Sequence, residues 1–335
     1  MEKEDGMGLL VDGQWVDQWY DTEGNAGRFV RQSSQYRNWI TPDGSPGPQG
    51  EGGFAAQSGR YHLYVSLACP WAHRTLIYRA VKGLEAHISV STVEPLMLEN
   101  GWTFSDAGDP LYGARYLHEI YTRVDPQATT RVTVPVLWDK QRETIVNNES
   151  AEIIRMLGSA FDHITGNSVD YYPEPLQAEI DALNARVYEQ VNNGVYRAGF
   201  ATTQEAYEEA YVALFALLDE LDERLAGHRY LLGDTITEAD WRLFTTLVRF
   251  DAVYFGHFKT NQRRIEDYAN LPGYVRDLYQ QPGVASTLNM THIKQHYYGS
   301  HRNINPTGIV PLGQEVDFSR PHHRAATGAG QKGSR

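Results

Sequence analysis

The stretch that decides the fold is Ala68–Ile77, ACPWAHRTLI, which contains the only cysteine among the 335 residues. It directly follows RYHLYVSL at Arg60–Leu67, where β-branched and aromatic residues recur with a period of about two and predict a strand. The apolar residues after the cysteine have helical spacing and predict a helix over Pro70–Lys82. Pro70 suits the first helical position, because it has no N–H to leave unsatisfied and its φ is already helical. Cys69 is therefore expected at or beside the N-cap of this helix.

The position of Cys69 favours a reactive thiol. The positive end of the helix dipole and the free backbone donors of the first turn stabilise a thiolate. His73 and Arg74 follow one turn later and could add positive charge. The alternative is an inert thiol in the core, since free cysteine is among the most buried residue types. The strand-to-helix junction and the proline that follows favour the reactive thiol.

The elements predicted around this motif form a compact, mixed unit. A second strand is predicted over Ile88–Val93, and a hairpin is predicted over Val132–Trp138 and Glu143–Asn147. A helix over Ser150–Leu157 follows the hairpin. The order is therefore strand, helix, strand, a long insertion over Leu96–Thr130, then strand, strand and helix, which is typical of a mixed α and β domain.

A proline lies in the middle of one predicted strand, in Thr133–Val136, TVPV. Proline costs a ladder hydrogen bond in mid-strand, so Pro135 is expected at an edge or in a special turn, with a cis bond as one form. It is either an ordinary edge-strand proline or a device that leaves the backbone of Val134 able to pair with an extended peptide. The Cys-Pro helix start upstream favours the second interpretation.

Glu149 and Ser150 stand at the predicted mouth of a helix, with Ser150 expected as its N-cap. A hydroxyl group and free amides at a helix N-terminus can bind a carboxylate, and the adjacent Glu149 can accept an ammonium group. The pair would fit the zwitterionic end of an amino acid. The alternative is that Ser150 is simply a cap, as most such serines are.

The rest of the chain divides into an irregular start, a helical second half and a polar tail. The first 58 residues hold scattered tryptophans and the Gly/Pro/Ser-rich stretch Thr41–Gly53, which indicates loops. TEAD at Thr237–Asp240 predicts a capping box, and the tail from Val316 onward is expected to be mobile. Helices are predicted over Leu176–Val191, Thr203–Leu225 and Thr237–Tyr254, with shorter ones after Pro272 and Pro282.

Composition and charge exclude several kinds of protein. Lys and Arg number 30 and Asp and Glu 42, so the net charge of −12 argues against nucleic acid or an anionic membrane as the main partner. No apolar run approaches the ~18 residues of a membrane helix, and the start MEKEDG is unlike a signal peptide. One cysteine excludes an intrachain disulfide and a multi-cysteine metal site. We expect a soluble, cytoplasmic protein without a metal.

Taken together, these motifs resemble the glutathione transferase superfamily, and more closely its xi class, the glutathionyl-hydroquinone reductases. The resemblance covers about 39–312. Its motifs are ACPWAHRTLI, GWTF at 101–104, VPVLWD at 134–139, NNES at 147–150, ITEADWRLFTTLVRFD at 236–251 and HYYGSHRNINPTGIVP at 296–311. It implies an α+β thioredoxin-like N-terminal domain followed by an all-α C-terminal domain. The implied division is an N-terminal extension at 1–58, a glutathione-binding domain at 59–165 with an insertion at about 96–130, a helical domain at 166–312 and a flexible tail at 313–335.

The resemblance also implies roles for single residues. Cys69 would be the catalytic thiol, and the residues that hold glutathione would be Trp102, Arg131, Val134, Glu149 and Ser150. The tyrosines that line an aromatic acceptor site would be Tyr196, Tyr254 and Tyr297, although the adjacent Tyr298 competes with the last of these. A homodimer is expected by the same resemblance.

The single cysteine also constrains the mechanism. A dithiol reductase resolves its mixed disulfide with a second cysteine, and this chain has none. The resolving thiol must come from solution, and glutathione fits. The predicted activity is reduction of S-glutathionyl-hydroquinones by thiol exchange. The alternatives are another cysteine-type glutathione transferase, such as a thiol transferase, dehydroascorbate reductase or reductive dehalogenase, or a non-catalytic binding module on the same fold.

Overall fold

The computed structural model describes residues 8–313 and 315–327, which form two compact units. The first unit comprises residues 8–20, 31–169 and 286–310. The second comprises residues 21–30, 170–285 and the described residues from 311 onward. Residues 286–310, which the sequence analysis placed in the helical domain, therefore group with the first unit.

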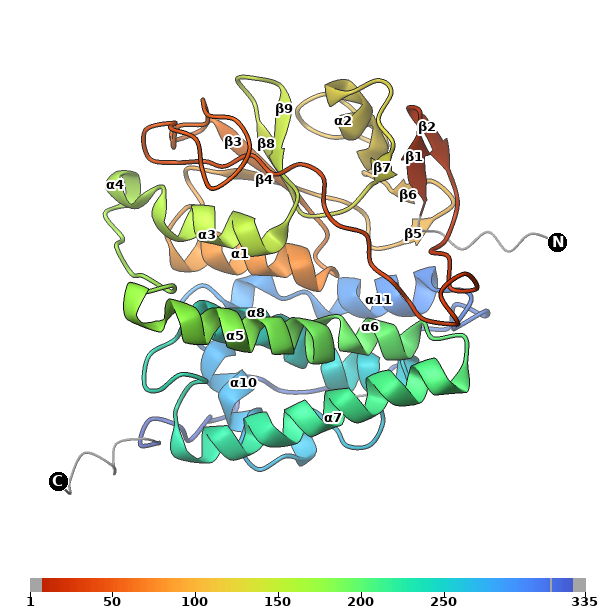
Figure 1. Ribbon diagram of the computed structural model, residues 1–335, viewed down its shortest axis with the longest axis vertical. Helices are drawn as coiled ribbons and strands as arrows, with labels where there is room; N and C mark the ends of the chain where they lie inside the picture. The colour runs from red at the N-terminus through yellow and green to blue at the C-terminus, as the bar shows by residue number, and fades with distance from the viewer. Residues whose placement is uncertain (1–7, 314, 328–335) are drawn as a thin grey trace. The chain divides into compact units, whose positions relative to one another are not determined.

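The first unit is built on a four-stranded sheet with the order β4-β3-β8-β9. β3 runs parallel to β4 and antiparallel to β8, and β8 runs antiparallel to β9. Figure 1 shows α1 and α3 side by side on one face of this sheet. All five residues of β3 are buried, as expected for a strand covered on both faces. The strands are β1 (Leu9–Val11), β2 (Gln14–Val16), β3 (Tyr61–Val65), β4 (Ser89–Thr92), β5 (Met97–Leu98), β6 (Gly101–Trp102), β7 (Thr130–Arg131), β8 (Val136–Asp139) and β9 (Thr144–Asn147). The helices of this unit are α1 (Pro70–Val81), α2 (Leu117–Val124), α3 (Ser150–Ser159), α4 (Asp162–Thr165) and α11 (Met290–Ser300).

The N-terminal extension contains regular structure that the sequence analysis missed. β1 pairs with β2 and, on its other side, with β7 of the insertion, so that a second sheet of three strands forms. Trp15 of β2 donates its indole N–H to the carbonyl of Glu99 at 2.9 Å and stacks on His118, with 4.9 Å between ring centroids. β1 and β2 are joined by a tight turn at Asp12 and Gly13, both with positive φ, and Asp-Gly is typical of two-residue hairpins, a signal that the sequence analysis did not use. The pairing of β1 with β7, more than a hundred residues away, has no local signal.

The predicted strand over Val132–Trp138 is shorter than expected. β8 begins at Val136, and the Val134–Pro135 peptide bond before it is cis, as the sequence analysis anticipated for this proline. The strand starts only after Pro135 because proline has no N–H for the ladder. The other predicted elements of the first unit are confirmed, with ends that differ by a few residues.

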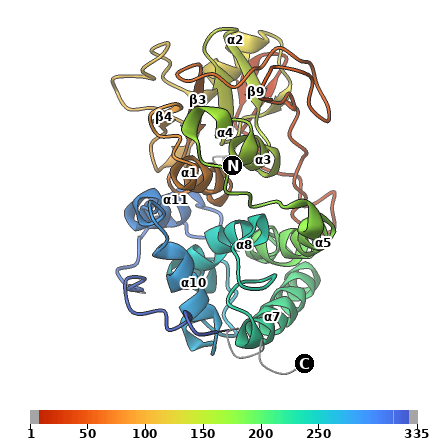
Figure 2. The same cartoon turned by 90° about the vertical axis from the view of Figure 1, so that its left-hand side faces the viewer.

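The second unit consists of helices packed around α8, every residue of which is buried. Figure 2 shows α5 and α10 on either side of α8. The predicted capping box is confirmed, because Thr237 and Asp240 cap the start of α8 reciprocally. Burial raises the pKa of Asp240 to about 6. The helices are α5 (Gln177–Val187), α6 (Gly194–Gly199), α7 (Gln204–Gly227), α8 (Glu238–Arg249), α9 (Phe255–His257) and α10 (Leu271–Tyr279), with π-helical turns at Tyr188–Asn192 and Phe250–Tyr254. A mixed α and β unit and a helical unit confirm the predicted fold class.

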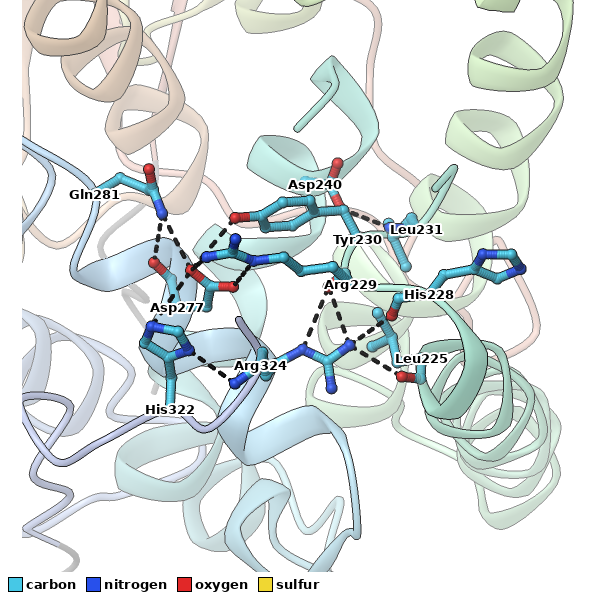
Figure 3. Close-up of polar contacts among 10 residues, drawn as sticks. All are labelled: Leu225, His228, Arg229, Tyr230, Leu231, Asp240, Asp277, Gln281, His322 and Arg324. Carbon is cyan, nitrogen blue, oxygen red and sulfur yellow. Dashed lines mark hydrogen bonds and ion pairs between the residues drawn. The ribbon is translucent and has the colours of Figure 1, made fainter. Parts of the chain in front are cut away.

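Part of the tail that was expected to be mobile is packed on this unit. Arg324 is 4% exposed and donates hydrogen bonds to the carbonyls of Leu225, His228 and Arg229, at 2.9, 2.6 and 3.0 Å (Figure 3). These residues lie at and just beyond the C-terminal end of α7, where carbonyls lack helical partners and the helix dipole attracts a cation. The buried guanidinium of Arg324 therefore binds the C-terminal segment to the end of α7.

We predict that Arg324→Ala lowers the free energy of unfolding by about 2 kcal/mol or more, because it leaves the buried carbonyl of Leu225 and the partly buried carbonyls of His228 and Arg229 without this donor. Arg320→Ala is the matched control, since Arg320 is half exposed and pairs with Glu266 at the surface, where an ion pair contributes only about 0–1 kcal/mol. Chemical denaturation of the three proteins measures the difference. Equal losses in the two variants would contradict this account of Arg324.

Candidate active site

The topology of the sheet brings three of the predicted site segments to one end of it. β3 leads into Cys69, and Val136 at the start of β8 pairs with Tyr64 near the end of β3. The loop before β8, which carries Val134, therefore meets the loop after β3. β9 is antiparallel to β8, so its last residue also lies at this end, and Glu149 follows two residues later.

Cys69 is the N-cap residue of α1, as the sequence predicts. Its backbone is extended, and Pro70 occupies the first helical position. The carbonyl of Cys69 accepts the first helical hydrogen bond from the N–H of His73, at 3.0 Å. The side chain thus stands at the positive end of a 12-residue helix, and the residue is 8% exposed. A thiolate here is stabilised by the helix dipole and by the first-turn amides.

The backbone of Val134 lies directly against this thiol. The Cys69 sulfur is 3.6 Å from the Val134 carbonyl oxygen and donates a hydrogen bond to it. Val134 is 5% exposed and precedes the cis proline. The structure therefore brings the thiol into contact with the segment that contains the cis proline, a contact that the sequence analysis did not predict.

The turn at Glu149 and Ser150 differs in one respect from the prediction. Glu149, not Ser150, is the N-cap of α3, because its backbone is extended and its Oε1 accepts a hydrogen bond from the N–H of Ala151 at 3.2 Å. Ser150 is the first residue of the helix, and its hydroxyl accepts from the guanidinium of Arg74 at 3.2 Å. A carboxylate and a guanidinium-linked hydroxyl therefore stand side by side at a helix N-terminus, which suits a zwitterion.

Arg131 and Trp102, the other predicted glutathione ligands, are held by residues far away in the sequence. Arg131 donates to the carbonyls of Gln18 and Trp19 at 2.7 and 3.1 Å, and its guanidinium lies 4.2 Å from the ring centroid of Tyr20. Burial lowers the pKa of Arg131. Trp102 is 7% exposed and stacks on His296 of α11, with 4.8 Å between ring centroids.

The predicted acceptor tyrosines divide between the two units. Tyr196 and Tyr254 belong to the second unit, where their ring centroids are 6.2 Å apart. Tyr297 belongs to the first unit, on α11, and packs against His296 and His301. Tyr297 is fully buried and Tyr298 is half-buried.

Sequence reasoning missed the residue that joins two of the site segments. The hydroxyl of Tyr121 donates to the carbonyl of Thr133 at 2.8 Å and accepts from the N–H of Thr133 at 3.2 Å and from the side-chain amide of Asn148 at 3.3 Å. It thereby links the residue before Val134 to the residue before Glu149. Tyr121 lies on α2 in the insertion, and no local signal distinguishes it from the other tyrosines.

Two further structural findings bear on the chemistry. Within residues 8–313 and 315–327, no group of three or more His, Cys, Asp or Glu side chains is arranged to hold a metal ion. No helix in the same part of the chain has the length and apolar character needed to cross a membrane. The arrangement provides a stabilised thiol, an extended backbone segment beside it and a charged helix start, which together suit thiol chemistry on a small peptide.

Comparison with known proteins agrees with this assembly. Residues 68–160 match the glutathione S-transferase N-terminal domain family, and residues 204–277 match the corresponding C-terminal domain family. The glutathionyl-hydroquinone reductase YqjG of Escherichia coli is 58% identical over 323 residues, which cover 95% of this chain and 98% of that protein. The glutathionyl-hydroquinone reductase PcpF of Sphingobium chlorophenolicum is also 58% identical, over 92% of this chain and 96% of its own length.

Solved structures give the same result. The glutathione-bound structure of YqjG superposes with a TM-score of 0.88 at 56% identity, over 95% of this chain and 99% of that one. The xi-class transferase of Natrialba magadii has a TM-score of 0.86 at 47% identity, over 97% and 98% of the two chains.

Proposed function

We propose that this chain, which belongs to the glutathionyl-hydroquinone reductases of the xi class of glutathione transferases, reduces S-glutathionyl-hydroquinones to hydroquinones with glutathione as co-substrate. The observation that carries the proposal is the position of Cys69. The only cysteine of the chain caps α1 with its sulfur 3.6 Å from the Val134 carbonyl, beside the segment suited to pair with a peptide.

In the first step the Cys69 thiolate attacks the sulfur of the S-glutathionyl-hydroquinone. A sulfur–sulfur bond forms between Cys69 and glutathione, and the bond between sulfur and the aromatic carbon breaks. The aromatic ring leaves with the electron pair of that bond and takes up a proton at carbon, so the hydroquinone is released. The dipole of α1 favours the attack, because it increases the fraction of thiolate.

In the second step a second glutathione, as thiolate, attacks the glutathione sulfur of the mixed disulfide. Glutathione disulfide leaves and the Cys69 thiolate is restored. The net reaction converts one conjugate and one glutathione into hydroquinone and glutathione disulfide. The two electrons gained by the aromatic carbon come from the two glutathione sulfurs, one from the conjugate and one from the entering thiol, which end as one disulfide. These two steps need no second cysteine in the protein, and the sequence has none.

The contacts to glutathione follow from the site. The backbone of Val134 would pair with the cysteinyl residue of glutathione, in the manner of strand addition. Glu149 and Ser150 would hold the γ-glutamyl ammonium and carboxylate, at the start of α3. Arg131 and Trp102 would complete the binding site. Their support is the family resemblance together with the positions of the two side chains, Trp102 being buried and Arg131 half-buried.

The acceptor side of the site would use phenol groups. Tyr196, Tyr254 and Tyr297 would line it, and a tyrosine hydroxyl there would polarise the phenol oxygen of the substrate or help to deliver the proton to carbon. The support for this set of three is the family resemblance, and within the second unit the ring centroids of Tyr196 and Tyr254 lie 6.2 Å apart.

We predict that Cys69→Ser abolishes turnover, because a serine hydroxyl neither forms the mixed disulfide nor ionises at neutral pH. The substrate is glutathionyl-menadiol with excess glutathione, and chromatography follows free menadiol and glutathione disulfide. The wild type should release both products in equal amounts. The control for folding is binding of glutathione by the variant, which its other contacts should preserve. Retained reductase activity in the variant would contradict the proposed mechanism.

The same assay separates the alternatives. Turnover of a small mixed disulfide without release of menadiol would make the protein a general thiol transferase. Failure of the wild type with both substrates would favour a non-catalytic binding module.

We predict that Glu149→Gln raises the KM for glutathionyl-menadiol about tenfold or more, because the glutathione part of this conjugate is the one that binds beside Cys69. A hydrogen bond to a charged group contributes about 1.5–3 kcal/mol, and about 1.4 kcal/mol is tenfold in binding. Glutamine keeps an oxygen that can accept from Ala151, so the cap of α3 is preserved. Glu143→Gln is the matched control, since Glu143 lies in the β8–β9 turn with a half-exposed side chain. Steady-state kinetics with varied glutathionyl-menadiol at saturating glutathione would contradict the role of Glu149 if the two variants had the same KM.

We also propose that the protein is a cytoplasmic homodimer, on the strength of the family resemblance alone. Sedimentation of the purified chain at micromolar concentration is expected to give twice the mass of 37.9 kDa. A monomer under these conditions would remove the dimer from the proposal and leave the chemistry at Cys69 unchanged.

A further inference from the structure

The N-terminal extension reaches the predicted binding site for the γ-glutamyl end of glutathione. The hydroxyl of Ser34 lies 3.2 Å from Oε2 of Glu149 and 3.3 Å from the carbonyl oxygen of Asn148. A serine hydroxyl has one proton to donate, and a hydrogen bond to a carboxylate is the stronger of the two. Ser34 precedes both segments that match the transferase domain families, which begin at residue 68.

Backbone hydrogen bonds hold Ser34 in this position. The N–H of Tyr36 donates to Oδ1 of Asn148 at 3.2 Å, and the N–H of Asn148 donates to the carbonyl of Tyr36 at 3.1 Å. The N–H of Asn38 donates to the carbonyl of Val146 at 2.9 Å. The extension therefore runs along β9, the last strand in the order of its sheet, and covers an edge that would otherwise expose backbone groups.

Asn148 connects this contact with the segment beside the thiol. Its side-chain amide donates to the hydroxyl of Tyr121, which is itself bonded to both backbone groups of Thr133. The ring of Tyr36 meets the ring of Tyr121 edge to face, with centroids 5.6 Å apart. A displacement of the extension would consequently change the positions of Glu149 and of the residue before Val134.

We propose that Ser34 is a positioning residue for glutathione, which acts by holding the Glu149 carboxylate in the orientation that receives the ligand's ammonium group. Oε1 of Glu149 is fixed by the N–H of Ala151, and Oε2 is fixed by Ser34. Each oxygen keeps a further lone pair for a ligand. Without Ser34 the Glu149 carboxylate is held through one oxygen only. It then becomes fully ordered only when the ligand binds, and this loss of conformational entropy weakens binding. This inference rests on the proposed function and extends it to a residue outside the matched domains.

The test uses the full-length protein and two ligands, glutathione and cysteinylglycine, which lacks the γ-glutamyl group. We expect Ser34→Ala to raise the Kd for glutathione about three- to tenfold, since it removes one charge-assisted hydrogen bond from a partly exposed site. The Kd for cysteinylglycine should not change, because that ligand lacks the γ-glutamyl ammonium, and its own amine stands where glutathione has a peptide nitrogen, one residue away from the position that Glu149 is proposed to bind. Isothermal titration calorimetry measures both constants, and Ser34→Thr, which retains a hydroxyl, should restore glutathione binding.

Ser33→Ala is the matched control, because Ser33 is the exposed neighbour of the half-buried Ser34. Its Kd for glutathione should equal that of the wild type, and thermal melting of all variants checks the fold. Equal Kd values for glutathione in the Ser34 and Ser33 variants would overturn the inference. An equal loss for both ligands in Ser34→Ala would overturn it as well, since it would show a general structural role.

The failure of this inference is distinguishable from the failure of the proposed function. Release of menadiol by the wild type tests the function and does not involve Ser34. A wild type that turns over substrate while Ser34→Ala binds glutathione normally would remove only the inference. A wild type that binds no glutathione would remove both.

Discussion

The structure depends on one electrostatic constraint, which is that a thiolate at Cys69 must be stabilised where little water reaches it. Burial by itself disfavours the charged form of a thiol. The N-terminus of α1 offsets this cost with its dipole and its unpaired first-turn amides. The Val134 carbonyl beside the sulfur accepts a hydrogen bond from the protonated thiol. The sheet order places the start of α1 and the start of β8 at the same end of the sheet, so the topology itself creates the site.

The insertion and the N-terminal extension bring the site residues into fixed positions. β1 pairs with β7, which carries Arg131, and the extension supplies the carbonyls that the Arg131 guanidinium binds. Tyr121 of the insertion joins the backbone at Thr133 to the side chain of Asn148. The N-terminal extension, which precedes both matched domains, therefore contacts two of the predicted glutathione-binding segments, at Arg131 and at Glu149. The thioredoxin-like sheet determines where each loop that carries a site residue leaves its strand. The insertion and the extension hold the rest of these loops in position.

The features that could be predicted from the sequence are those fixed by neighbours along the chain. The place of Cys69 follows from Pro70 and the flanking patterns, and the special bond at Pro135 follows from a proline that a strand excludes. The features that were missed depend on distant partners. The pairing of β1 with β7 joins residues more than a hundred positions apart, and Tyr121 has a role only because Thr133 and Asn148 fold against it. In the sequence Arg324 is one residue of a polar tail. Its structural role depends on the carbonyls at the end of α7, which only the folded chain places beside it.

In a catalytic cycle with a single cysteine, one binding site for glutathione serves both half-reactions. The first glutathione enters as part of the conjugate and remains bonded to Cys69, whereas the second must approach its sulfur from outside. The residues that hold the first glutathione therefore orient the disulfide for the second attack, because exchange requires the three sulfur atoms to lie nearly in line. A change at Glu149 would thus impair both half-reactions through the position of one ligand. In the proposed cycle the position of this one ligand therefore matters in both half-reactions, although the reacting bond involves only one side chain of the protein.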